Sequence, residues 1–143
     1  MKLLLTTVLL IFTLTAFSQS NTVIGTYVLT LGTKENDTFE YKLTLSQDST
    51  FYFHYYSNIK RGIPPEKHKY GKGKWSEQKN VISFRTDKKS DLDEKHTLDF
   101  TNSKARFIIK SPRNKTESVI KTRLLFLESD IFWMKNIAML KLE

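Results

Sequence analysis

The clearest pattern in the chain is the alternation of apolar and polar residues from 39 to 45. Apolar side chains occupy the odd positions, which is the two-residue period of a strand with one buried face. Turn-forming residues at 46–49 interrupt the alternation, and an aromatic and β-branched run follows at 50–56. The pattern predicts a β-hairpin. The side chains expected to share its buried face are Tyr41, Leu43, Phe51, Phe53 and Tyr55.

More strands are predicted on both sides of this hairpin. Residues 23–31 alternate loosely and end at Gly32, which indicates a first strand directly before it. Later in the chain, short apolar or aromatic runs are separated by polar turns, as in antiparallel meanders. These runs predict strands at residues 70–75, 81–84, 96–100 and 105–109.

Two segments between these strands are expected to be loops. Residues 57–69 contain the consecutive Pro64 and Pro65, and proline has no N–H group to donate to a ladder. Residues 86–95 are charged without a period, and Leu92 is their only apolar residue.

The segment after residue 118 permits two interpretations. Apolar residues recur there at helical spacing, so an α+β fold with a C-terminal helix at about 118–135 is the alternative. Against the helix, β-branched residues cluster at its start, and residues 127–132 repeat the turn chemistry of residues 45–51. We therefore predict strands at residues 119–127, 130–135 and 138–142.

The strands together predict an all-β fold. A sheet of about ten short strands does not stay open and flat, because strands twist and unpaired edges are a liability. Consecutive hairpins favour an antiparallel up-and-down meander that closes into a lipocalin-like barrel. We expect a single such domain at residues 19–143.

The first residues predict a signal peptide at 1–18. Lys2 gives a positive start, an apolar run follows to Phe17, and Ala16 and Ser18 are small residues at the positions that a signal peptidase reads. The run is shorter than the roughly 20 apolar residues of a transmembrane helix. The chain has no cysteine, so neither a disulfide nor a cysteine-linked lipid anchor is available. We expect a protein that is periplasmic or secreted after removal of the signal peptide.

The chain is basic, with 23 Lys and Arg against 15 Asp and Glu and a formal net charge of +8. This balance favours contact with anionic surfaces. Export and the lack of a nucleic-acid-binding motif argue against nucleic acid, so an anionic envelope surface is the expected partner. The predicted anion contacts are Lys60, Arg61, Lys67, Lys69, Lys72, Arg106 and Arg113.

Side chains for catalysis or metal binding are sparse. The three histidines, His54, His68 and His96, are not spaced as ligand pairs, and no thiolate is available. No nucleophile motif or phosphate-binding loop occurs. We predict no catalytic residue, no metal site and no cofactor, and hence a protein that is not an enzyme.

Several short motifs resemble a known class. They are the segments 25–27, 43–45, 73–75, 80–84 and 139–142, with Asp48 and Phe51. In these motifs the chain resembles lipocalin-like barrels and, in style, small exported barrels related to the N-terminal domain of the copper-resistance lipoprotein family. The cysteines of that family are missing, so its copper and signalling roles are not carried over. The resemblance implies a barrel with a cavity for a small apolar ligand.

The aromatic residues are the best material for a binding site. A barrel of about eight strands is either filled by its side chains or holds one small ligand, and both outcomes are open. One hypothesis is a small apolar or amphipathic ligand inside the barrel. The other is a solid-core interaction module whose basic loops contact anionic envelope components or a protein partner. The residues expected to line the interior are Tyr41, Phe51, Phe53, Tyr55, Trp75, Phe84, Phe100, Phe107 and Trp133.

Overall fold

A computed structural model describes residues 23–109 and 121–143. Within these residues the chain forms nine strands and one turn of 3-10 helix, η2. The elements are β1 (Gly25–Gly32), β2 (Thr38–Leu45), β3 (Thr50–Asn58), β4 (Glu66–Gln78), β5 (Val81–Arg85), β6 (His96–Leu98), β7 (Lys104–Ile108), β8 (Arg123–Glu128), η2 (Phe132–Met134) and β9 (Ala138–Lys141).

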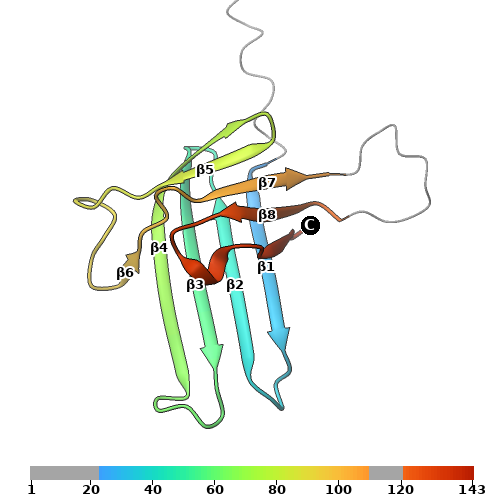
Figure 1. The fold of residues 1–143 in the computed structure, drawn as a ribbon, viewed down its shortest axis with the longest axis vertical. Helices are drawn as coiled ribbons and strands as arrows, with labels where there is room; N and C mark the ends of the chain where they lie inside the picture. The colour runs from blue at the N-terminus through green and yellow to red at the C-terminus, as the bar shows by residue number, and fades with distance from the viewer. Residues whose placement is uncertain (1–22, 110–120) are drawn as a thin grey trace, which may run out of the picture.

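Eight of the strands close into an antiparallel barrel (Figure 1). Their order is β3-β2-β1-β9-β8-β7-β5-β4, and pairing of β4 with β3 closes the ring. The short β6 pairs in parallel with β4. The predicted all-β meander is therefore confirmed, and the alternative with a C-terminal helix is wrong because β8 pairs with both β7 and β9.

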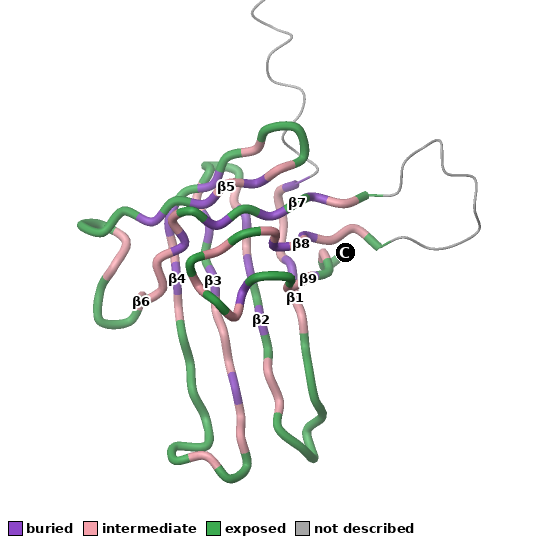
Figure 2. The backbone as a smooth tube through the Cα atoms, in the orientation of Figure 1, coloured by how far each residue is buried: buried purple, intermediate pink, exposed green. Residues whose placement is uncertain are grey.

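The core consists largely of aromatic rings in mutual contact. Phe100 lies 4.9 Å from Phe53 and 5.2 Å from Phe51, measured between ring centroids. Phe51 also meets Phe84 edge to face at 5.1 Å, a preferred arrangement of aromatic pairs. Figure 2 shows the buried positions concentrated where the strands form the closed ring.

The first four strands are longer than the strands that complete the ring. β1 to β4 contain 8, 8, 9 and 13 residues, whereas β5, β7, β8 and β9 contain 5, 5, 6 and 4. β9 pairs with β1 only at Tyr27 and Val28, and β5 pairs with β4 only from Lys74 onward. One end of the four-stranded sheet therefore extends past the ring, where exposed positions predominate (Figures 1 and 2).

Several predicted segments need correction. The strand predicted at 96–100 ends at Leu98, and the one predicted at 119–127 begins at Arg123, with residues 119–120 outside the described part of the chain. The loop predicted at 57–69 is shorter, because β3 continues to Asn58 and β4 begins at Glu66. Both prolines fit in the remaining turn, so they do not limit the ladder. The strand predicted at 130–135 is also wrong, since the backbone turns there: Met134 N–H donates to the Ile131 carbonyl, which forms η2.

Candidate ligand-binding site

The extended end of the sheet presents two rows of side chains across β1 to β4. Directly opposed residues of antiparallel strands lie on the same face. The pairing places Leu29, Tyr41, Tyr55 and Lys69 in one row. The row farther from the ring contains Leu31, Phe39, Ser57 and Lys67. We call these two rows the open inner face, because the next row toward the ring, which includes Tyr27, Leu43 and Phe53, is fully buried core.

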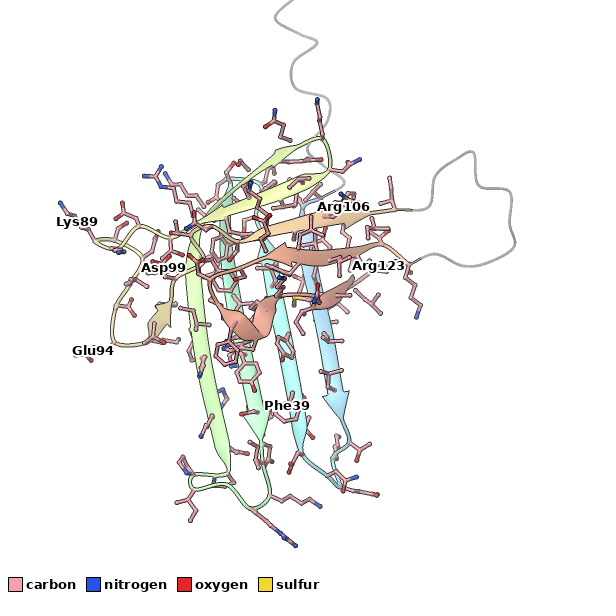
Figure 3. All side chains as sticks on the ribbon, in the orientation of Figure 1. Phe39, Lys89, Glu94, Asp99, Arg106 and Arg123 are labelled. Carbon is pink, nitrogen blue, oxygen red and sulfur yellow. The ribbon has the colours of Figure 1, made fainter. Side chains whose placement is uncertain are left out.

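The open inner face is apolar on one side and basic on the other. Leu31 is 43% exposed, and Leu29 and Phe39 are partly exposed while packing against the core. Figure 3 shows Phe39 on the part of β2 that extends beyond η2. On β4, by contrast, the exposed Lys67 and Lys69 end the two rows. The face is therefore apolar at β1 and β2 and positively charged at β4.

η2 places Trp133 over the row that is nearer to the ring, which contains Tyr41, Tyr55 and Lys69. The Trp133 ring lies 4.9 Å from the Tyr55 ring and 6.0 Å from the Tyr41 ring. The Lys69 ammonium sits 5.7 Å from the centroid of the Trp133 ring, a cation–π distance. Burial, and then the neighbouring Tyr55, raise the pKa of Tyr41, so its hydroxyl stays a neutral donor and acceptor at physiological pH. This corner offers ring surface, a hydroxyl and a cation together.

The structure places every predicted interior aromatic residue in the core or against it. Tyr55 and Trp133 are the two that are only partly buried. The other seven are buried. Tyr41, which is 8% exposed, belongs to the open inner face, whereas the remaining six face other side chains of the core. These six are Phe51, Phe53, Trp75, Phe84, Phe100 and Phe107.

The predicted anion contacts are dispersed. Lys67 and Lys69 lie on the open inner face, and Lys60 and Arg61 lie in the turn at the same end of the sheet. Lys72 points from the outer face of β4 and pairs with Asp93 at 3.7 Å. These residues therefore do not form one surface, and their contact with an anion stays a prediction. Arg106 lies on β7 in the ring, away from the open inner face (Figure 3), and Arg113 is outside the described residues.

Sequence reasoning missed a cluster on the outer face of β3 and β4. His54 Nε2 and His68 Nδ1 are 2.9 Å apart, and the His54 ring stacks on Tyr70 at 4.6 Å. Burial, and then the neighbouring His68, lower the pKa of His54, which keeps its ring neutral at pH 7. The two histidines are 14 positions apart, so only the register of the β3–β4 pair brings them together.

The third histidine belongs to a separate hydrogen-bonded turn. Asp93 accepts from the backbone N–H groups of Lys95 and His96 and lies 3.0 Å from His96 Nδ1. These hydrogen bonds, those from His96 foremost, lower the pKa of Asp93 to about 2. In the described part of the chain, no group of three or more His, Asp or Glu side chains is arranged to hold a metal ion.

The fold defines the class as an eight-stranded antiparallel barrel with one end of its sheet extended. A scan against protein-family models found no match, and neither curated proteins nor solved structures gave one. Across residues 23–109 and 121–143, no helix has the length and apolar character needed to cross a bilayer.

Proposed function

We propose that this protein is an exported, non-enzymatic lipocalin-like carrier that binds a small amphipathic ligand with an anionic group. The observation that carries the proposal is the open inner face, which is apolar at one side and carries two lysines at the other, with Trp133 against Tyr55 and Lys69. Export rests on the signal peptide predicted at 1–18, which lies outside the described residues. The relation to the copper-resistance lipoprotein family rests on the short motifs alone.

The two sides of the face match the two parts of an amphipathic molecule. A hydrocarbon chain lying across Leu29, Leu31 and Phe39 removes apolar surface from water, which contributes about 25 cal/mol per Å². An anionic group at the other side meets Lys67 and Lys69, and hydrogen bonds to charged groups contribute about 1.5–3 kcal/mol each. The ring contacts among Phe51, Phe53 and Phe100 occupy the interior beyond, so the ligand is expected at the mouth of the barrel.

Decanoate, used below its micelle-forming concentration, tests this function. We expect saturable heat in calorimetry and a change in Trp fluorescence, because Trp133 lies at the site. The double variant Lys67→Glu/Lys69→Glu should weaken binding at least about tenfold by replacing two attractive charges with repulsive ones. Lys88→Glu/Lys89→Glu is the matched control, since it changes the net charge equally and both lysines are exposed in the loop after β5.

Two results would overturn the proposal. One is the absence of any heat or fluorescence change with decanoate. The other is an equal loss of affinity in Lys67→Glu/Lys69→Glu and in Lys88→Glu/Lys89→Glu, which would indicate attraction by net charge and no site. Uncharged 1-decanol should bind more weakly than decanoate, because it lacks the group that meets the lysines.

A second candidate function is an interaction module that contacts an anionic envelope surface. It is favoured by Ile63, which is 98% exposed in the turn between β3 and β4, next to exposed Arg61 and Lys60. The turn is held in shape, because Ile59 N–H donates to the Pro65 carbonyl and Lys60 N–H donates to Asp37 Oδ1. An apolar tip beside cations is suited to a bilayer interface.

Sedimentation with vesicles tests this second function. Vesicles containing phosphatidylglycerol should retain the protein better than pure phosphatidylcholine. Ile63→Ser should lower that retention at least about fivefold, since burying an isoleucine side chain contributes about 1.5–3 kcal/mol. Phe132→Ser is the control, because Phe132 is 86% exposed on η2 and not on this turn. Equal losses in the two variants would contradict a role for the turn, and vesicle binding without decanoate binding would favour the module over the carrier.

A further inference from the structure

A surface groove lies on the outer side of the sheet, on the opposite face from the proposed carrier site. Its volume is about 590 Å³, within the range of about 300–1,000 Å³ typical of small-ligand sites. It is open to solvent over the pair β3–β4, and the segment before β6 forms one of its walls. Its lining residues are Lys42, Thr44, Tyr52, Phe53, His54, Tyr70, Gly71, Lys95 and His96.

The groove runs between two neighbouring outward rows of the sheet. Tyr52 belongs to one row, and His54 with Tyr70 belongs to the next. Residues two apart on a strand are separated by about 6.6 Å. A planar ring that lies between two side chains makes a carbon–carbon contact of about 3.5 Å on each of its faces. The sum of these two distances is close to the spacing of the rows.

The walls of the groove are held in place before any ligand arrives. The His54 and Tyr70 rings are stacked with an angle of 7° between their planes. His54 is fixed further by its contact with His68, where the ring nitrogens are 2.9 Å apart. On the other side of the groove Tyr52 is 55% exposed, so its ring is available for contact.

The charge of the lining is entirely positive or neutral. Lys42 and Lys95 line the groove, and no carboxylate does. The nearby Asp93 does not itself line the groove; it contacts His96, which does, and Lys72 on the adjacent row. The Lys95 ammonium lies over the Tyr70 ring, 4.7 Å from its centroid, which places a cation against the aromatic wall. After burial and the neighbouring His68, which lower the pKa of His54, Glu40 raises it and Lys42 and Lys95 lower it, so the two lysines face one carboxylate near the groove.

From this arrangement we infer that the outer groove binds a small planar aromatic anion, whose ring lies between Tyr52 and the His54–Tyr70 wall and whose charge meets Lys42 and Lys95. This site is separate from the open inner face and stands independently of the carrier function. Ring stacking supplies contact area, and the two cations supply the preference for an anion.

The test uses 2-naphthoate as the probe, followed by amide chemical shifts and calorimetry. Saturable binding is expected, with shifts of the Tyr52 and Gly71 amides at the groove. Lys42→Gln/Lys95→Gln should reduce affinity at least about tenfold by removing both charges. Tyr52→Ser should also weaken binding, whereas Tyr52→Phe should retain it because the ring is kept. Lys89→Gln is the control, since Lys89 lies in the exposed loop away from the groove (Figure 3).

Three comparison ligands separate the two parts of the inference. Neutral 2-naphthol binding as tightly as 2-naphthoate would overturn the role of the lysines. Cyclohexanecarboxylate or inorganic phosphate binding equally well at the same amides would overturn the role of ring stacking. No saturable binding of 2-naphthoate to the folded chain, with its amide spectrum intact, would overturn the site itself. Retained 2-naphthoate binding in Lys67→Glu/Lys69→Glu would show that the groove is independent of the inner face.

Discussion

Phe100→Ala is expected to lower the free energy of unfolding by about 3–5 kcal/mol, the usual range for removing a buried phenylalanine. Phe100 is fully buried, and its ring contacts Phe51, Phe53 and Phe84. The truncation leaves a cavity that three large rings cannot easily close. Urea denaturation followed by circular dichroism measures the change.

Phe132→Ala is the matched control for this prediction. Its side chain is 86% exposed, and a surface substitution of this kind changes stability by no more than about 0.5 kcal/mol. A loss below about 1 kcal/mol in Phe100→Ala would mean that the ring cluster is not the centre of the core. The fold described above would then need revision.

Gly73→Ala is expected to be the most damaging small substitution in β4. A Cβ atom at Gly73 would lie 2.1 Å from the Arg85 carbonyl oxygen, which belongs to the backbone of β5. Because the backbone of a paired strand cannot move aside cheaply, we expect a loss of at least about 3 kcal/mol, at the upper end of the range for overpacking.

Gly71→Ala, two residues earlier on the same strand, gives the comparison. Its Cβ atom would lie 2.7 Å from Phe100 Cε2, and a side chain can shift where a backbone cannot. We expect a loss of about 1–3 kcal/mol. Denaturation curves of the two variants in parallel decide the matter, and a Gly73→Ala protein at least as stable as Gly71→Ala would refute the close approach of β4 to β5.

The interior of the barrel could be predicted from the sequence because strand periodicity is a local property. The alternation at 39–45 and the aromatic run at 50–56 fix which side chains share a face, and the observed register pairs Tyr41 with Tyr55 and Leu43 with Phe53. The error at 130–135 has a local cause as well. Short apolar runs fit a strand or a 3-10 turn equally well, and the backbone hydrogen bond from Met134 to Ile131 decides between them.

The candidate site could be predicted only in part, because it depends on register between strands. Lys67 and Lys69 were predicted from their charge alone. Because a loop was expected at 57–69, the sequence did not show that these lysines lie in the same rows as Leu31 and Leu29. The His54–His68 contact and the groove beside it depend on the same pairing of β3 with β4. Composition identified the residue types, and only the fold brought them together.

Because the strands are unequal in length, different parts of the same sheet have different structural roles. The short strands β5, β7, β8 and β9 determine where the ring closes. The ends of β1 to β4 that extend past the ring, here called the overhang, do not take part in closing it. Substitutions at the tips of the overhang should therefore change the open inner face at little cost to folding. Adding or deleting residues there in pairs would preserve the inward and outward alternation, so the proposed binding face can be lengthened or shortened one row at a time.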